Sequence, residues 1–167
     1  DAHILLGDAA VADDRLVLAV AAYRKARDLD ASEEAALRLA NALFRAGDSA
    51  GSGAAILALR DSQPSSIAAD RLAGHLAMDL EHWKRAIAHF ERVRHRIGDR
   101  DVVILRELAR AQVASGDAKQ ALRTIARAYR LQPLNRDIML IYADLLDGDG
   151  DANNAEALRD KAAQIGK

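Results

Sequence analysis

Cysteine is missing from all 167 residues of this chain, which excludes disulfide bonds, thiolate metal sites and cysteine nucleophiles. Aromatic residues make up only 4% of the sequence, and proline occurs twice. A β-sheet protein normally contains more aromatic and β-branched residues than this. Alanine and leucine dominate the apolar half of the composition; both favour helices, and alanine lets helices approach closely. The composition therefore favours closely packed helices.

The sequence also lacks an excess of either charge, because it contains 24 Lys and Arg and 25 Asp and Glu. General nucleic-acid binding requires a basic excess that neutralises phosphates, so this balance argues against it. No apolar run approaches the roughly 20 residues that span a bilayer, and no secretory signal peptide is visible.

The first residue is Asp1 rather than methionine, so we expect the chain to be a piece of a longer protein. The Ala-, Arg- and Asp-rich composition is typical of a GC-rich bacterium. The compartment, bacterial cytoplasm or periplasm, stays open.

A pattern of small residues recurs along the whole chain with separations of 33 to 35 residues. A large side chain follows four positions after most of these residues, and a small or branched one follows three positions later. Several markers share one register, which indicates a repeated pair of helices. The small residues of the second helices are Ala19, Ser52, Ala86, Ala121 and Ala155, and those of the first helices are Gly7, Ala40, Gly74, Ala109 and Ala143.

These markers resemble the tetratricopeptide repeat, a 34-residue helix-turn-helix unit. Leu6-Gly7, the run from Ala19 through Tyr23 to Ala26, and the run from Ala121 to Pro133 carry the resemblance. It covers all 167 residues and implies an all-α fold, a right-handed α-α superhelix of five units. The aromatic residue that the family places early in each first helix is absent; His3, Ala36, Asp70, Leu105 and Met139 stand there.

We predict a single array over residues 1–167, with units of about 1–32, 33–66, 67–100, 101–135 and 136–167. Ser32, Ser65 or Ser66, and Asn135 are the expected helix caps. Gly51 and Gly53 should fray the start of their helix, because glycine destabilises a helix interior. The predicted first helices are 2–12, 33–46, 67–80, 102–114 and 136–147, and the second helices are 15–29, 50–62, 83–96, 118–131 and 152–165.

In this family the first helices line a concave groove that holds an extended peptide or a partner helix, so the resemblance implies such a groove here. Arginine binds carboxylates well, and apolar residues lie beside the predicted arginines. We therefore expect a segment with an acidic residue near an apolar one. Alternatively, the arginines pair internally with Glu107 or Asp70. The predicted groove residues are Asn41, Phe44, Arg71, His75, Met78, Arg106, Arg110 and Val113.

No motif predicts catalytic, cofactor-binding or metal-binding residues, so we do not expect an enzyme. Asp147, Asp149 and Asp151 resemble the start of a calcium loop, but Ala152 and Leu158 stand where that loop needs glycine and glutamate. These aspartates also fit the ordinary turn between two helices. The chaperone-binding carboxylate clamp known in the family is not supported, because Leu37 occupies a position that requires lysine.

Three functions remain open: a protein-binding scaffold, a self-association or docking module of a larger bacterial protein (in secretion, exopolysaccharide export or regulation), and a regulatory arm of an enzyme. The apolar run Ile4-Leu5-Leu6 supports the second function, self-association or docking. We expect further repeats or a partner surface to cover it. The alternative is that two of the three residues face the core.

Overall fold

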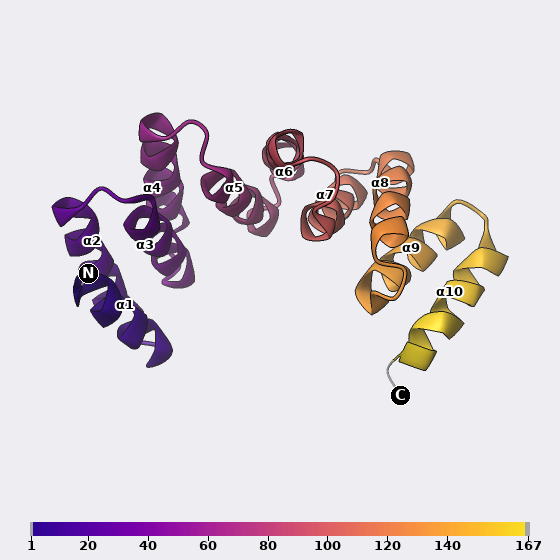
Figure 1. Ribbon diagram of the computed structural model, residues 1–167, viewed down its shortest axis with the longest axis horizontal. Helices are drawn as coiled ribbons and strands as arrows, with labels where there is room; N and C mark the ends of the chain where they lie inside the picture. The colour runs from indigo at the N-terminus through magenta and orange to yellow at the C-terminus, as the bar shows by residue number, and fades with distance from the viewer. Residues whose placement is uncertain (1, 166–167) are drawn as a thin grey trace. The chain divides into compact units, whose positions relative to one another are not determined.

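The computed structural model describes residues 2–165, and in this range all regular structure is helical (Figure 1). Each helix begins and ends within one residue of its predicted bounds. None of the described helices is both long and apolar enough to cross a membrane. The helices are α1 (Ala2–Ala12), α2 (Leu16–Leu29), α3 (Glu33–Arg45), α4 (Ser49–Ser62), α5 (Ile67–Asp79), α6 (Trp83–Ile97), α7 (Val102–Ala114), α8 (Ala118–Leu131), α9 (Arg136–Gly148) and α10 (Ala152–Ile165).

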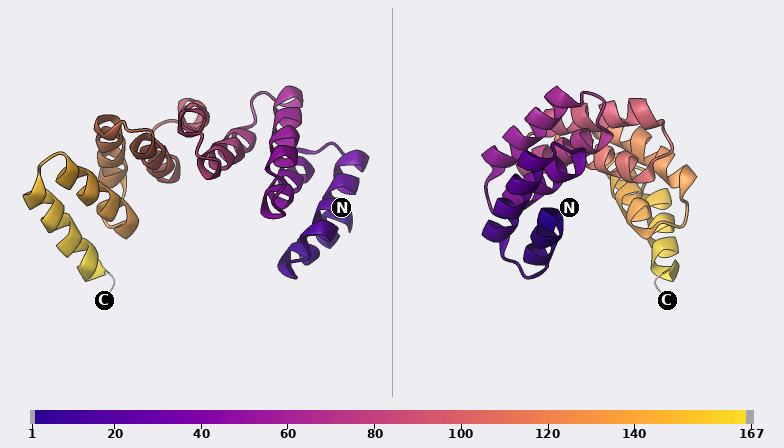
Figure 2. Two further views of the ribbon diagram at one scale, coloured as in Figure 1. Left: turned by 180° about the vertical axis from the view of Figure 1, so that it is seen from behind. Right: turned by 60° about the vertical axis from the view of Figure 1, so that its left-hand side comes forward.

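The chain divides into two compact units, unit 1 at Asp1–Leu80 and unit 2 at Glu81–Lys167. Unit 1 holds α1 to α5, and its α1–α2 and α3–α4 pairs each form a hairpin. Unit 2 holds α6 to α10, and the left view of Figure 2 shows its α7–α8 and α9–α10 hairpins. The predicted single array over residues 1–167 stays a prediction.

The repeat period sets the burial of the small residues. All five markers of the second helices, from Ala19 to Ala155, are 0% exposed. In the first hairpin the reason is geometric: a Cβ added at Gly7 would lie 2.3 Å from Cε1 of the Tyr23 ring. Glycine at this position therefore lets the aromatic ring of α2 pack directly on the backbone of α1.

The turns inside the helix pairs share one backbone feature. At the same place in each pair, one residue has a positive φ, the left-handed conformation that commonly ends a helix. Glycine adopts it freely, whereas aspartate and glutamate adopt it at some cost. The five residues are Asp14 (φ 56°), Gly47 (φ 84°), Glu81 (φ 57°), Gly116 (φ 87°) and Gly150 (φ 92°).

Side-chain caps confirm the predicted helix starts and correct one expectation. Ser32, Ser66 and Asn135 accept hydrogen bonds from the backbone N–H groups three residues on. The expectation that glycines fray the start of α4 is wrong, because the helix is regular from Ser49. Asp48 accepts a hydrogen bond from the Gly51 N–H at 2.7 Å, and a Cβ at Gly51 would lie 2.3 Å from this carboxylate. The glycine makes room for the cap.

The apolar run at the N-terminal end of α1 is largely exposed. Leu5 is 69% and Leu6 46% exposed. Leu39 and Leu108, which occupy the place of Leu6 in later pairs, are at most 1% exposed. The alternative that two of the three residues in Ile4-Leu5-Leu6 face the core is therefore wrong.

Candidate functional site

Two adjoining depressions lie between the first helices α7 and α9 of unit 2. One, of about 430 Å³, is lined by Arg106, Arg110, Asp137, Leu140 and Ile141. The other, of about 350 Å³, contains Arg110 and Ile141 again, and adds Val113, Ala114, Asp144 and Leu145. Because they share two residues, we treat them as one furrow, with a charged end and an apolar end, and call it the α7–α9 furrow.

The two arginines of the furrow converge on Glu107, whose side chain is only 7% exposed. Arg106 donates to Glu107 Oε1 from Nε at 3.1 Å and from Nη2 at 2.9 Å, and its Nη1 lies 3.9 Å from Asp137 Oδ2. Arg110 Nη1 lies 3.5 Å from Glu107 Oε2, and the Arg110 side chain is 57% exposed. Internal pairing, the alternative weighed from the sequence, is thus present. Arg106 is fixed by it, whereas Arg110 keeps most of its donors for a ligand.

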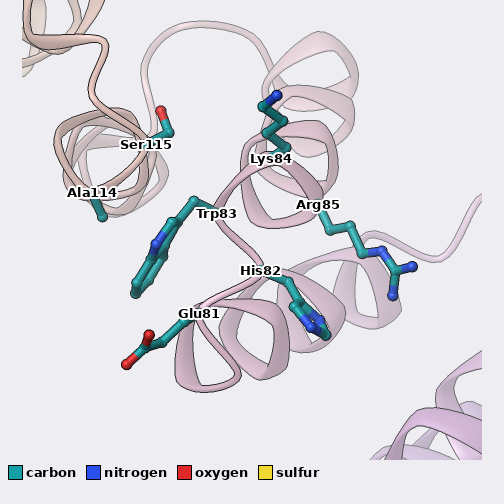
Figure 3. A pocket seen from close by; sticks show the side chains of 7 residues that line it. All are labelled: Glu81, His82, Trp83, Lys84, Arg85, Ala114 and Ser115. Carbon is teal, nitrogen blue, oxygen red and sulfur yellow. The ribbon is translucent and has the colours of Figure 1, made fainter.

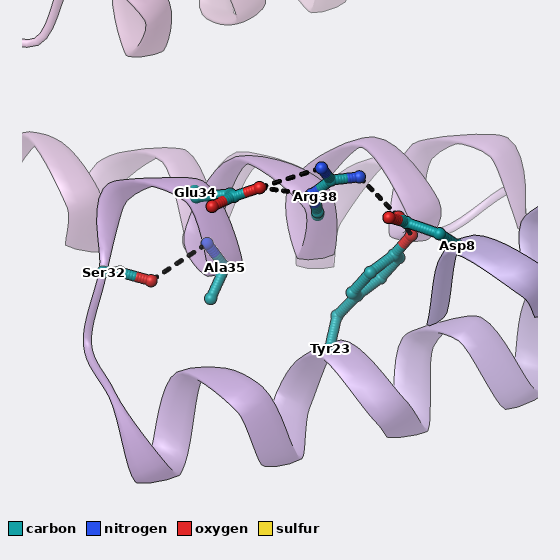
Figure 4. A network of polar contacts seen from close by, with 6 residues as sticks. All are labelled: Asp8, Tyr23, Ser32, Glu34, Ala35 and Arg38. Atoms are coloured by element: carbon teal, nitrogen blue, oxygen red, sulfur yellow. Dashed lines mark hydrogen bonds and ion pairs between the residues drawn. The ribbon is translucent and has the colours of Figure 1, made fainter. Parts of the chain in front are cut away.

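In unit 1 a depression of about 320 Å³ lies where α1 and α3 meet, and the predicted groove residue Asn41 lines it. A polar network closes one wall of it (Figure 4). Tyr23 donates from its hydroxyl to Asp8 Oδ1 at 2.6 Å. Arg38 donates to the same carboxylate and, from Nη2, to Glu34 at 2.8 Å. The network joins α1, α2 and α3, so it serves the fold.

The pKa values of two members of this network, Tyr23 and Arg38, are raised. Burial, together with the hydrogen bond to Asp8 and the nearby charge of Asp8, raises the pKa of Tyr23 from 10.0 to about 12. The hydrogen bond from Arg38 to Glu34 raises the pKa of the guanidinium, which stays charged. Tyr23 is therefore protonated at physiological pH, and its hydroxyl donates to Asp8.

The other predicted groove residues of unit 1 lie on α3 and α5. Phe44, Arg71 and Met78 are partly buried, and His75 is exposed. They do not line the α1–α3 depression, which takes in only Asn41 from the predicted set. Their assignment to a binding surface stays a prediction.

A third depression of unit 2, of about 400 Å³, lies beside the turn that precedes α6. In Figure 3 the Trp83 indole lies on the same side as Ala114, while the side chains of Arg85 and His82 point the other way. Ser115 donates its hydroxyl to the backbone carbonyl of Gln112 at 2.9 Å. These side chains point in different directions rather than toward one point (Figure 3).

The aspartates of the calcium-like segment have other roles among residues 2–165. Asp147 and Asp144 each lie 3.0 Å from Arg159 Nη2, and these hydrogen bonds raise the pKa of Arg159. Asp151 accepts a hydrogen bond from Asn154 at the start of α10. Within the described range no three histidine, aspartate or glutamate side chains gather as metal ligands would.

Sequence reasoning placed Val113 in the groove, and Val113 lines the apolar end of the α7–α9 furrow. It missed Ile141 and Leu145, which line this end from α9. The adjacent apolar residues Leu140 and Ile141 could have indicated an apolar wall on α9. Only the packing of α9 against α7 shows which side of α9 borders the furrow.

Comparison with known proteins agrees with this architecture. Residues 106–167 match the family model of the tetratricopeptide repeat. The structure of MamA from Desulfovibrio magneticus RS-1 is 15% identical, with a TM-score of 0.87 over 98% of this chain and 92% of that chain. PilF of Pseudomonas aeruginosa is 19% identical, with a TM-score of 0.85 over 100% of this chain and 76% of that chain. No curated protein sequence matches the chain. The predicted all-α class of repeated helix pairs is confirmed.

Proposed function

We propose that this chain, whose residues 106–167 match the model of the tetratricopeptide repeat, is a non-catalytic scaffold that binds an extended segment of a partner protein on its first helices. Tetratricopeptide-repeat proteins are generally scaffolds of this kind. The observation that carries the proposal is the α7–α9 furrow, which combines half-buried apolar side chains with an exposed guanidinium.

The furrow favours a segment with an apolar side chain next to a carboxylate. The apolar side chain would lie against Ile141 and Leu145, and burying it would supply most of the affinity. The carboxylate would bind Arg110, because Arg106 is already held by Glu107 on two donors. Asp144 at the edge of the furrow would repel a second acidic residue on the apolar side. The ligand therefore has a defined direction.

Peptide selection followed by a matched pair of variants tests this proposal. A displayed library of random peptides is selected on the intact chain, and the affinities of the selected peptides are measured by fluorescence anisotropy. Arg110→Glu with Val113→Glu alters two exposed side chains of the furrow. Arg24→Glu with Lys25→Glu, on the exposed face of α2, is the control.

We expect the selected peptides to pair an acidic residue with an apolar one, and the furrow variant to lower their affinity by at least about tenfold. The control should change it by less than about twofold. Selected peptides that bind the furrow variant as tightly as the unmodified chain would refute the proposal. Circular dichroism would verify that both variants fold.

A second candidate, self-association, rests on the exposed Leu5 and Leu6. Two copies that pair these faces would bury side chains that contact water in the single chain. Sedimentation of the unmodified chain and of Leu5→Glu with Leu6→Glu tests it. A concentration-dependent dimer that only the variant loses supports this candidate; a monomer at all concentrations rejects it.

A further inference from the structure

The near-neutral total charge of the chain hides a strong local segregation. Residues 81–136 contain thirteen Lys and Arg against six Asp and Glu. Residues 137–167, in the same compact unit, contain three Lys and Arg against seven Asp and Glu. The basic excess is concentrated on the second helices α6 and α8.

On α8 the basic residues form one stripe. Lys119, Arg123, Arg127 and Arg130 are spaced by four, four and three residues, so they lie along one face of the helix. All four side chains are exposed, and α8 contains no acidic residue. We call these four residues the α8 stripe.

The complete stripe of four cations occurs only on α8 among the second helices. The corresponding row is Val17, Ala21, Lys25 and Asp28 in α2, and Ala50, Ala54, Ala58 and Asp61 in α4. The row contains Lys84 and Arg92 in α6, and Lys161 in α10. Because α4 forms its hairpin with no cation in this row, the fold does not require cations there.

Little inside the protein neutralises the stripe. Arg127 forms an ion pair with Asp99 at 2.7 Å, and Arg123 donates to the neutral amide oxygen of Gln120. Among residues 2–165, Lys119 and Arg130 contact no acidic side chain. Asp99 also lies 3.6 Å from Arg94 of α6, and Arg94 pairs with Glu91 at 2.8 Å as well.

We propose that the α8 stripe is a second binding surface, and that it takes an extended acidic segment of a partner protein. Successive cations separated by four residues rise by about 6 Å along the helix. In an extended chain, alternate side chains point the same way and lie about 6.7 Å apart. A segment with Glu or Asp at every second position thus places its carboxylates opposite the stripe. There an arginine can donate two parallel hydrogen bonds to one carboxylate.

The surface chemistry of α8 favours this occupant over a nucleic acid. The only aromatic residue of α8, Tyr129, packs against Tyr142 with ring centroids 5.5 Å apart and accepts a hydrogen bond from Lys161. Its ring is therefore engaged and does not offer a stacking platform for bases.

Three probes and three double variants test the proposal on the intact chain. The probes are a labelled nine-residue peptide with glutamate and serine alternating, a peptide of the same composition with its glutamates in one block, and a six-nucleotide oligothymidine. Lys119→Glu with Arg130→Glu changes the two stripe residues that lack acidic partners. Arg24→Glu with Lys25→Glu produces the same change in net charge on α2. If the charge-reversing variant of the stripe fails to fold, Lys119→Gln with Arg130→Gln, which only removes the two charges, is measured in its place.

We expect the alternating peptide to bind at low salt, at least about threefold tighter than the blocked peptide, and to weaken as the Debye length shortens from about 10 Å at 0.1 M to about 3 Å at 1 M salt. The stripe variants should lower its affinity by about tenfold, and the α2 control by less than about twofold. Arg110→Glu should have no effect, which keeps this surface separate from the α7–α9 furrow.

Other results overturn the proposal. Equal loss in the stripe and α2 variants would mean that only net charge matters. Equal affinity for the two peptides would refute the spacing argument. Tighter binding of the oligothymidine would assign the stripe to nucleic acid, and no binding of any probe at low salt would remove the surface altogether.

Discussion

Two glycine-to-alanine substitutions in unit 1 should change stability in opposite directions. Alanine has the higher helix propensity, so either substitution gains up to about 1 kcal/mol in a helix interior. At Gly53 the added Cβ would lie 3.9 Å from Leu76 Cδ2, an ordinary contact. Gly53→Ala should therefore stabilise the protein by about 0.5–1 kcal/mol.

At Gly7 the added Cβ would lie 2.3 Å from the Tyr23 ring. The ring cannot move away freely, because it is 3% exposed and its hydroxyl is bonded to Asp8 at 2.6 Å. Overpacking of this kind costs about 1–3 kcal/mol. After the gain in propensity, Gly7→Ala should destabilise the protein by about 0.5–2 kcal/mol.

Urea denaturation followed by circular dichroism measures both effects, and both sites belong to the same compact unit. The effect of Gly7→Ala is measured again in a Tyr23→Leu background, where the added methyl no longer meets a ring. There its cost should largely disappear. If Gly7→Ala stabilised the protein as much as Gly53→Ala does, our account of the α1–α2 contact would be wrong.

Two further predictions concern Tyr23 and the start of α5. The pKa of Tyr23 is raised to about 12 by burial and Asp8, so the stability that this phenol contributes is complete below about pH 10 and is lost as the pH rises through 12. Tyr23→Phe should cost about 1–2 kcal/mol at pH 7, and chemical denaturation should show this deficit shrinking above pH 10; a constant deficit from pH 8 to 12 would contradict it. Ser66→Ala removes the cap on the Ala69 N–H and the hydrogen bond that the Ser66 hydroxyl donates to Glu33. It should cost about 1–2 kcal/mol in thermal denaturation, whereas Ser65→Ala, at an exposed neighbour, should cost almost nothing; equal losses in the two variants would contradict this account.

The helices could be predicted from the sequence because their determinants are local and repeated. A cap such as Asn135 and a left-handed turn such as Gly116 fix the ends of a helix through bonds within a few residues. Small residues at fixed intervals identify the crossings, since only they let two backbones approach. Each helix pair repeats the same information, so one atypical residue, such as Arg159 at the position that Tyr23 occupies in α2, does not obscure the register.

The candidate site could be predicted only in part, because it depends on partners distant in the fold. The sequence placed Arg106 and Arg110 on one face of a helix, but not the difference between them. That difference arises from how deeply Glu107 is buried and which donors reach it. The apolar wall of the furrow likewise depends on how α9 rotates against α7, and a shift of one residue moves a side chain by about 100°.

The two proposed surfaces follow from one property of repeated helix pairs. Packing constrains the small and large residues that recur in every unit, so those residues carry little information about a partner. Positions that face solvent are free to differ between units, and an unusual residue there costs the fold almost nothing. The exposed guanidinium of Arg110 and the four cations of the α8 stripe are departures of this kind. Because they lie on a first and a second helix of unit 2 respectively, the two proposed surfaces are separate, and variants on one surface should leave the other intact.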